Sequence, residues 1–256
     1  MTEAVPTYRQ RGRAESFGSV AAEYDRLRPS YPSALIDDLA ALGEDVLDVG
    51  CGTGKAARLL AARGLNVLGV EIDPEMAAVA RAHGITVEVS GFEAWQDAGR
   101  RFDLITCAQA WHWIEPEAGL AKAVSVLRQR GTLVPFWNYA ELDLNVQEAM
   151  REVYARLEPS LLQSVTFAGV QGRRLDITDW STDPRLAAVE LRTYPWERRY
   201  DTTEWLELIQ THSDHLQLEP AHRAEVVHAV GAAIDELGGD VAAHYTTYAV
   251  FARMAS

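Results

Sequence analysis

The feature that most constrains the fold of this chain is a glycine-rich turn directly after a short apolar run. Residues 46–54 read VLDVGCGTG, with Gly50, Gly52 and Gly54 at every second position. Glycine adopts backbone conformations that other residues avoid, and it lets a ligand approach the main chain closely. An apolar strand that ends in such a turn and leads into a helix is typical of cofactor-binding α/β folds. The turn therefore predicts where a ligand binds, and its identity has to come from other residues.

Apolar strands alternate with helices on both sides of this turn. Strands are predicted over residues 46–49, 66–71, 85–90, 102–109 and 132–137, and helices over 55–63, 74–83 and 115–131. Asp73 is predicted to cap the second of these helices, which has Pro74 at its first position. The alternation predicts a doubly wound, mostly parallel sheet with helices on both faces. Ligands of such sheets bind at the carboxyl ends of the strands, so the loops after these strands are expected to converge.

The pattern changes after Asn138. Residues 140–185 are predicted to form an irregular helical insertion. A strand over residues 186–200, two helices over about 203–216 and 220–237, and a β-rich closing run AHYTTYAVFARM follow. We expect a single domain over residues 1–256.

Composition and charge limit the possible partners. The chain has 256 residues, 37 acidic against 24 basic side chains and a net charge of −13, which disfavours binding to a nucleic-acid backbone. No apolar run approaches the length of a membrane span, and the polar start predicts no signal peptide. The two cysteines, Cys51 and Cys107, lie in no CxxC pattern, so we expect neither a structural metal site nor a disulfide. These features predict a cytoplasmic protein without membrane or nucleic-acid partners.

Three kinds of ligand bind at glycine-rich turns of this type. A phosphate loop requires GxxxxGK[ST], whereas here Lys55 is followed by Ala56, which excludes that pattern. A dinucleotide fingerprint requires GxGxxG, and the GxGxG spacing here is one residue short, although Glu71 stands at the end of the second strand. The third ligand is an adenosine without a pyrophosphate, which a glycine-rich turn can also accommodate. Glu71 then accepts hydrogen bonds from ribose hydroxyls, and Asp48 lies near a positive group.

Four segments in order carry a resemblance to a known family. VLDVGCGTG, VLGVEIDPEM, VEVSGFEAW and FDLITCAQAWHWI resemble the first four motifs of class I S-adenosylmethionine-dependent methyltransferases. FGSVAAEYDRLRPSYP at residues 17–32 and the closing YAVFARM extend the resemblance. The nearest group is the small-molecule type 11 methyltransferases, including those similar to trans-aconitate methyltransferases. The resemblance implies a seven-stranded Rossmann-like sheet whose last strand runs antiparallel between strands five and six.

The resemblance also implies a site for S-adenosyl-L-methionine, with S-adenosyl-L-homocysteine as product. By motif position, Asp48 helps to hold the amino group, Glu71 holds the ribose hydroxyls, and residues 92–93 flank the adenine ring. Many relatives have Asp at the position of Phe92. The cofactor-binding residues that it implies are Tyr24, Arg28, Asp48, Gly50, Cys51, Gly52, Gly54, Glu71, Ile72, Phe92, Glu93, Gln109 and Ala110.

The methyl acceptor is expected beside the loop after the fourth strand. Its candidate contacts are Tyr31, Trp111, His112 and Trp137. His112 has a titration range that suits a general base, and packing in a loop is the alternative. Residues 1–33 would form a lid, and residues 140–185 would cover the acceptor.

The predicted activity is metal-free methyl transfer to a small organic molecule by direct in-line displacement. A non-catalytic S-adenosylmethionine-binding module and a nicotinamide-dependent oxidoreductase are the alternatives. The oligomeric state stays open.

Overall fold

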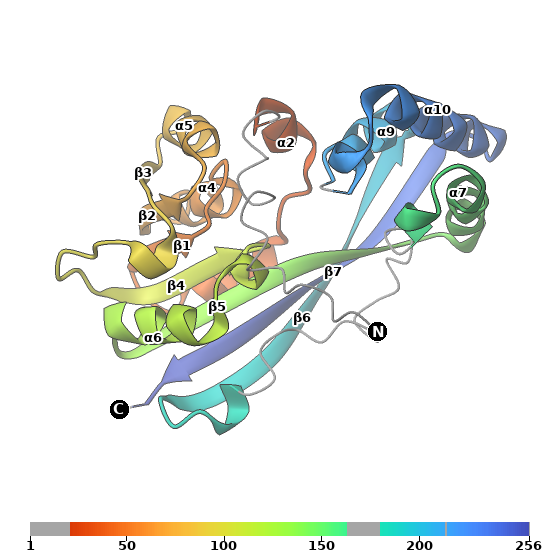
Figure 1. The fold of residues 1–256 in the computed structure, drawn as a ribbon. Helices are drawn as coiled ribbons and strands as arrows, with labels where there is room; N and C mark the ends of the chain where they lie inside the picture. Colours follow the sequence, from red (N-terminus) through yellow and green to blue (C-terminus); the bar gives the residue numbers. More distant parts are fainter. Residues whose placement is uncertain (1–20, 163–179, 213, 256) are drawn as a thin grey trace, which may run out of the picture.

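A computed structural model describes residues 21–162, 180–212 and 214–255 of the chain. Its strands form one seven-stranded sheet in the order β3-β2-β1-β4-β5-β7-β6 (Figure 1). β7 pairs antiparallel with both β5 and β6, and the pairs among β1 to β5 are parallel. This topology confirms the predicted methyltransferase-like sheet, including the place of its last strand. The strands are β1 Asp45–Val49, β2 Asn66–Glu71, β3 Thr86–Val89, β4 Phe102–Ala108, β5 Leu127–Leu142, β6 Leu186–Asp201 and β7 Asp240–Met254.

Helices connect the strands and cover both faces of the sheet. The α-helices of the described residues are α2 Ala21–Leu27, α3 Ser33–Ala40, α4 Lys55–Ala61, α5 Pro74–Ala82, α6 Pro116–Val126, α7 Leu144–Leu157, α9 Thr202–Gln210 and α10 Pro220–Glu236. Short 3₁₀ turns are η3 Phe92–Ala94, η4 Trp111–Trp113, η5 Pro159–Leu161, η7 Trp180–Thr182 and η8 His215–Gln217. The Asp73 carboxylate accepts hydrogen bonds from the N–H groups of Glu75 and Met76, so it caps α5 as predicted.

Alternate residues of the central strands enter two separate cores. Val46 of β1 packs with Leu35 of α3 and Leu60 of α4, whereas Leu47 faces the opposite core, to which Leu120 of α6 belongs. All five side chains are 3 % exposed or less. Side chains of a strand point alternately to the two faces, so near-continuous burial along β1 requires helices on both faces. The sheet is therefore a central layer whose carboxyl edge is left for the connecting loops.

Three strands extend well beyond the other four. β5, β6 and β7 have 16, 16 and 15 residues, against 5 in β1 and 7 in β4. Their outer ends carry α7, α9 and α10, which enclose a further core around Trp205 and Tyr154 (Figure 1). We call this part, residues 140–157 and 196–245, the extension. The molecule thus has one continuous sheet with two groups of helices along it.

The start of β5 differs from the sequence prediction. Residues 127–131 were predicted to complete a helix that ends at Gly131, but α6 ends at Val126 and β5 begins at Leu127. Arg128 forms ion pairs with Asp45 at 2.7 Å and Asp103 at 2.8 Å, which hold this segment beside β1 and β4. Such contacts come from distant parts of the sequence, so helix propensity alone misplaces the boundary.

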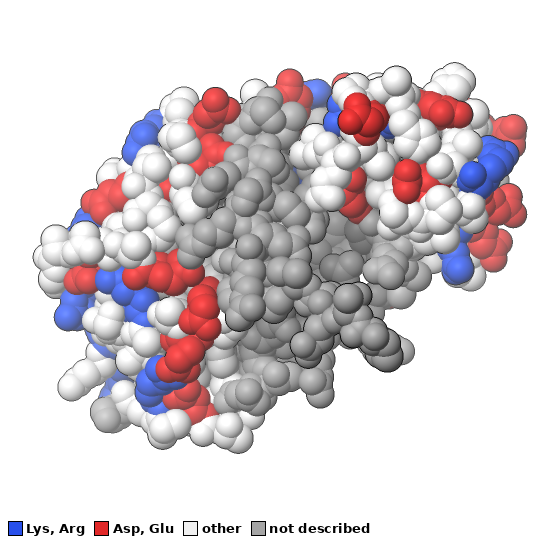
Figure 2. All heavy atoms as spheres, in the orientation of Figure 1, with Lys and Arg blue, Asp and Glu red and all other residues white. Residues whose placement is uncertain are grey.

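The predicted insertion, residues 140–185, is only partly described. Residues 140–142 belong to β5, and α7 follows; residues 163–179 lie outside the described residues, as do residues 1–20 of the predicted lid. None of the helices in the described segments has both the length and the apolar character needed to cross a bilayer. On the face shown in Figure 2, acidic and basic side chains are interspersed at both ends of the molecule.

Candidate functional site

The glycine turn lies at the carboxyl end of β1 and approaches the loop after β4. Gly50, Gly52 and Gly54 have φ values of +61°, +55° and +80°, a region that side chains disfavour. A Cβ atom added at Gly50 would lie 2.6 Å from the Cβ atom of Ala110. Only glycine therefore lets these two loops come together. The thiols of Cys51 and Cys107 are both free, as predicted.

Asp48 is a fully buried carboxylate at the same end of β1. Its Oδ1 accepts a hydrogen bond of 2.8 Å from the Thr106 hydroxyl, while its Oδ2 is buried without a partner. Burial and, less strongly, the Glu71 carboxylate raise the pKa of Asp48 to about 7, against the opposing effects of the Thr106 bond and the Ala57 N–H. A buried carboxylate oxygen without a donor is unfavourable, and a cationic ligand would satisfy it.

Glu71 ends β2 and joins two loops. Its Oε2 accepts a hydrogen bond of 2.8 Å from the Gly52 N–H, and its Oε1 accepts one of 2.9 Å from the Asp73 N–H. Burial raises the pKa of Glu71, and these N–H donors oppose the rise. Each carboxylate oxygen has a second lone pair, so Glu71 can accept bonds from a diol as well as fix the glycine turn.

The residues after β2 and β3 form one side of the same edge. Ile72 is half-buried, whereas Phe92 is 4 % exposed, with its ring centroid 6.5 Å from that of Trp111. Glu93 accepts a hydrogen bond of 3.2 Å from the Glu115 N–H. Phe92 therefore lies within the core beside the turn, and its side chain offers no hydrogen bond.

The loop after β4 has a strained backbone. Gln109 has a φ of +61°, which is uncommon for a residue with a side chain, and its N–H donates to the Phe136 carbonyl at 2.9 Å. Gln109 and Ala110 are half-buried where this loop meets the glycine turn. Strain of this kind persists where the surrounding structure enforces it, often at ligand sites.

The aromatic residues after β4 take up different positions. Trp111 is 2 % exposed and packs edge-on against Trp180 at 5.4 Å, so nearly all of its surface contacts protein. The Trp137 indole N–H donates to Nδ1 of His112 at 3.3 Å. A neutral His112 ring that accepts this bond carries its own proton on Nε2. His112 can then take up a proton only at Nδ1, after the Trp137 bond is released.

The segment from Tyr24 to Tyr31 brings α2 over this edge. The Arg28 guanidinium lies 5.1 Å from the Tyr24 ring and donates to the Thr211 carbonyl at 2.8 Å, while its Nε is buried without a partner. The Tyr31 ring packs edge-on against Phe136 at 4.9 Å. Burial raises the pKa of Tyr31, and Tyr24 and Asp48 add to the rise. Lys55, which directly follows Gly54, donates to the Asp25 carbonyl of α2. The segment predicted as a lid thus reaches the glycine turn.

Ion pairs that sequence reasoning missed hold α2 on both sides. Asp25 accepts a bond of 2.6 Å from Arg58 of α4 and pairs with His83 after α5 at 3.0 Å. Toward the extension, Arg26 pairs with Glu207 of α9 at 2.8 Å. The run YDRLRP contains Asp25 and Arg26, but its pattern does not indicate their partners. α2 therefore connects the two groups of helices.

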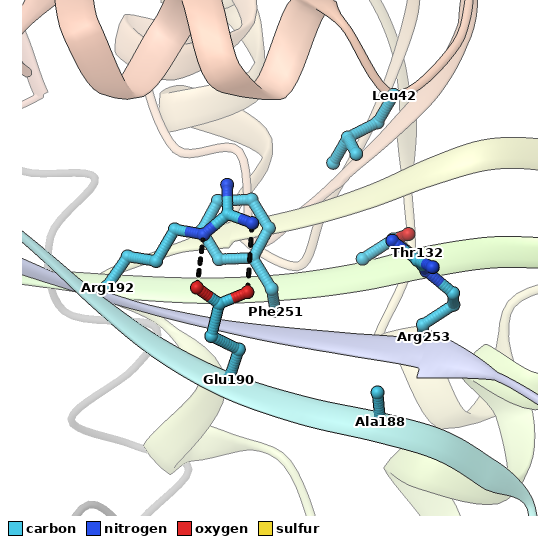
Figure 3. A pocket seen from close by; sticks show the side chains of 7 residues that line it. All are labelled: Leu42, Thr132, Ala188, Glu190, Arg192, Phe251 and Arg253. Atoms are coloured by element: carbon cyan, nitrogen blue, oxygen red, sulfur yellow. Dashed lines mark hydrogen bonds and ion pairs between the residues drawn. The ribbon is translucent and has the colours of Figure 1, made fainter.

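A cavity at the opposite edge of the sheet is not part of this site. It has a volume of about 270 Å³ and lies where β6 begins and β7 ends (Figure 3). Figure 3 shows the Arg192 guanidinium bonded to the Glu190 carboxylate there, and it also stacks on Phe251 at 4.2 Å. Since these charges already satisfy each other, the cavity does not suggest a polar ligand.

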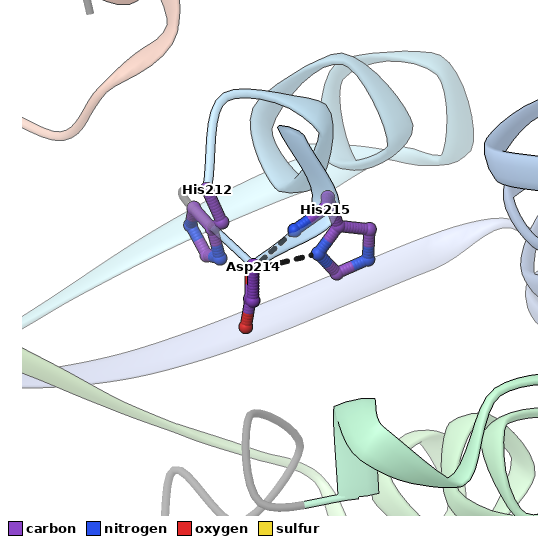
Figure 4. A group of neighbouring side chains, drawn as sticks. All are labelled: His212, Asp214 and His215. Atoms are coloured by element: carbon purple, nitrogen blue, oxygen red, sulfur yellow. Dashed lines mark hydrogen bonds and ion pairs between the residues drawn. The ribbon is translucent and has the colours of Figure 1, made fainter. Parts of the chain in front are cut away.

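Within the described residues, three side chains come close enough to suggest a metal site. His212, Asp214 and His215 have possible ligand atoms within 4.8 Å of one another (Figure 4). However, Nδ1 of His215 lies 3.0 Å from the Asp214 carboxylate, and its Nε2 lies 3.0 Å from the Tyr154 hydroxyl. Both nitrogens of His215 are engaged, so the cluster serves as a structural network.

Comparisons with known proteins agree with this geometry. Residues 46–131, from β1 to the start of β5, match a family model described as a methyltransferase domain. Uncharacterised methyltransferases of Mycobacterium bovis and Mycobacterium tuberculosis are 36 % identical to this chain over 187 residues, which is 70 % of this chain and 77 % of theirs. A ubiquinone biosynthesis O-methyltransferase of Acinetobacter baylyi is 34 % identical over 103 residues, 37 % of this chain and 43 % of that protein.

Solved structures share the fold. A structure from Anaeromyxobacter dehalogenans with a provisional type II methyltransferase assignment has a TM-score of 0.60 at 24 % identity, over 88 % of this chain and 96 % of that one. Phosphoethanolamine N-methyltransferase 2 of Haemonchus contortus, solved with S-adenosyl-L-methionine, has a TM-score of 0.54 at 14 % identity, over 99 % of this chain and 61 % of that one.

Proposed function

This chain belongs to the S-adenosylmethionine-dependent methyltransferases, and we propose that it transfers the methyl group to a small organic acceptor by direct in-line displacement. The observation that carries the proposal is the buried Oδ2 of Asp48, which has no partner beside a turn that only glycine can form. The ammonium group of an amino-acid ligand would satisfy that oxygen. Family membership favours this activity over a nicotinamide-dependent oxidoreductase and over a binding module without catalysis.

The residues at this edge fit S-adenosylmethionine by their chemistry. Asp48 would hold the amino group, Glu71 the ribose hydroxyls, and Arg28 with Tyr24 the carboxylate. The remaining proposed contacts are Gly50, Cys51, Gly52, Gly54, Ile72, Phe92, Glu93, Gln109 and Ala110. When bound, the cofactor supplies a sulfonium methyl group, whose bond to sulfur breaks as the acceptor atom attacks the methyl carbon.

We propose that the chain itself positions the cofactor and the acceptor and excludes water from them. Tyr31, His112, Trp137 and the half-buried Trp113 beside them are proposed to bound the acceptor, with residues 1–33 as a lid and residues 140–185 as a cover. Holding two reactants in position lowers the barrier without a dedicated base. His112 remains the candidate general base, with Nδ1 as the atom that accepts the proton.

A binding experiment with two matched glycine variants tests this proposal. Gly50 and Gly64 both have a positive φ. A Cβ atom added at Gly50 would lie 2.6 Å from Ala110, whereas one added at Gly64 would have no neighbour within 4 Å. We expect the wild-type chain and Gly64→Ala to bind S-adenosylmethionine one to one in calorimetry, with no binding of a nicotinamide dinucleotide. Gly50→Ala should lose binding. A folded, ligand-free wild-type chain that does not bind S-adenosylmethionine would refute the proposal.

A further inference from the structure

Two half-buried arginines, one after α2 and one on β6, have no acidic partner among the described residues. Within the described segments, neither Arg28 nor Arg198 pairs with a carboxylate; Arg28 donates to the Thr211 carbonyl, and Arg198 lies over the Tyr200 ring at 4.5 Å. This is unexpected in a chain with 37 acidic and 24 basic side chains. The neighbouring Arg199, by contrast, pairs with Asp240. Burying a cation without a counter-charge is unfavourable unless a ligand supplies that charge.

Arg198 belongs to a rigid aromatic and polar strip on one face of the long strands. The Tyr200 and Tyr245 hydroxyls are 2.8 Å apart, and the Tyr245 ring stacks on Trp196 at 4.3 Å with an interplanar angle of 14°. The Trp196 indole N–H donates to the Thr247 hydroxyl at 3.0 Å. These contacts fix the side chains around Arg198, so a ligand there would meet a preorganised surface.

The strip continues to the segment that follows α2. The Thr247 hydroxyl donates to the Asn138 amide oxygen at 2.6 Å, and the Asn138 amide nitrogen donates to the Ser30 carbonyl at 2.9 Å. Ser30 precedes Tyr31, whose ring packs against Phe136, and the Phe136 carbonyl accepts the Gln109 N–H at 2.9 Å. A continuous set of contacts therefore leads from Arg198 to the proposed cofactor site.

The charges of Arg28 and Arg198 both act on two further side chains, Lys55 and Tyr245. Burial lowers the pKa of Lys55, the Asp25 carboxylate opposes this, and the charges of Arg58, Arg198 and Arg28 lower it further. Lys55 directly follows Gly54 and donates to the Asp25 carbonyl. Burial raises the pKa of Tyr245, and the same two arginine charges oppose that rise. Arg28, which follows α2, and Arg198 of β6 thus act on the same two groups.

We propose that Arg198, with the Tyr200 and Tyr245 hydroxyls beside it, binds an oxyanion group of the methyl acceptor, so that the acceptor is a small organic anion. The proposal rests on the methyl-transfer function proposed above and names the class of its acceptor. Arg28 keeps its place at the cofactor carboxylate, and Arg198 is a specificity residue. A planar guanidinium pairs with either a carboxylate or a phosphate through two parallel hydrogen bonds. The acceptor's oxyanion would anchor it while its nucleophilic atom faces the methyl group.

The test uses two small anions as probes and a neighbouring arginine as control. The full chain, saturated with S-adenosylhomocysteine, is titrated with succinate, inorganic phosphate and the cation choline, with thermal unfolding and calorimetry as readouts. We expect saturable binding of at least one anion and none of choline. Arg198→Met should weaken that binding tenfold or more, and Arg198→Lys less, because lysine keeps the charge but loses the paired donors. Arg199→Met should bind as the wild type does.

The outcomes separate this proposal from the one on which it rests. S-adenosylmethionine affinity is measured for each variant, and it should be unchanged in Arg198→Met, which also shows that the variant is folded. If no anion binds the wild type, or if Arg199→Met weakens binding as much as Arg198→Met, the anion site is wrong whatever the cofactor result. If the wild type does not bind S-adenosylmethionine, the methyl-transfer proposal is refuted instead. Preference for succinate or for phosphate identifies the acceptor's anionic group.

Discussion

The carboxyl edge of the sheet and the extension both bury polar side chains, but they satisfy them differently. In the extension, Tyr154 bonds to His215, which bonds to Asp214, and the Trp205 indole N–H is the exception without a partner. At the carboxyl edge, one oxygen of the buried Asp48 carboxylate has no hydrogen-bond donor. Burying a charged group without a partner is more unfavourable than burying a neutral N–H in the same way. Polar groups that satisfy one another stabilise a fold, whereas a buried charge left incomplete indicates a ligand.

The largest expected effect separates the two regions by stability. Trp205 is 1 % exposed and lies at the centre of the extension core. Trp205→Ala should lower the free energy of unfolding by about 3–5 kcal/mol, because it removes a buried aromatic side chain and leaves a cavity. S-adenosylmethionine affinity at low temperature should change less than about twofold, since no proposed cofactor contact is removed. Urea denaturation and calorimetry measure the two quantities, and a tenfold loss of affinity would show that the regions are not separable.

The second prediction concerns Glu71, which joins the two loops at the carboxyl edge. Glu71→Ala should weaken S-adenosylmethionine binding about 100-fold and lower the free energy of unfolding by about 1–3 kcal/mol, because the Gly52 and Asp73 N–H groups lose their acceptor. Glu75→Ala, at an exposed position on α5, is the control and should change neither quantity. Equal effects of the two substitutions in calorimetry would contradict the role of Glu71.

The third prediction follows from the raised pKa of Asp48, about 7 against 3.8 for a free side chain. Between these values the folded chain binds more protons than the unfolded chain, so this group's contribution to stability is complete below about pH 4 and is lost as pH rises through 7. Asp48→Asn should therefore be more stable than the wild type at pH 8, by about 1–3 kcal/mol.

Cofactor affinity should show the opposite trend with pH. The ionised Asp48 carboxylate attracts an ammonium group, so wild-type affinity for S-adenosylmethionine should rise between pH 6 and 8 and then level off. Asp48→Asn should bind more weakly and lack this rise. Calorimetry across that range checks both curves, and parallel pH profiles would assign the dependence to another group.

The smallest expected effect concerns a satisfied pair in the extension. Tyr154→Phe removes the hydroxyl that bonds to Nε2 of His215 and should lower the free energy of unfolding by about 1 kcal/mol. Cofactor affinity should not change. Tyr248→Phe, at a half-buried position of β7, serves as the matched control and should leave stability within about 0.5 kcal/mol. A change in cofactor affinity with Tyr154→Phe would break the distinction between the two regions.

The elements with strong local signals were predictable from the sequence. β2 has the predicted bounds, residues 66–71, because an apolar run ends at a carboxylate and a capped helix follows. The length of β5 was not predictable, since its first residues, LRQRG, carry no strand pattern and are held by Arg128 contacts with Asp45 and Asp103. Local pattern thus located the central sheet but not the reach of its long strands.

The candidate site divides in the same way. The glycine turn and Glu71 can be recognised because glycines in a tight turn and a carboxylate at the next strand end form a sequence motif with fixed spacing. Thr106 beside Asp48 and Tyr245 beside Trp196 produce no such pattern, because these neighbours are set by strand pairing, Asp48 with Thr106 and Trp196 with Tyr245. Partners that meet through sheet register need the structure.

The position of β7 between β5 and β6 also sets an order of assembly. β6 pairs with no described strand other than β7, and β5 gains its second neighbour only from β7. During synthesis, residues 240–254 emerge about a hundred residues after β5. Until then, the edges of β5 and β6 that pair with β7 have unpaired N–H and C=O groups. Such edges are where nascent chains associate wrongly, and pairing between distant segments is slow. The extended sheet therefore makes this chain depend on late residues for protection from aggregation while it is being made.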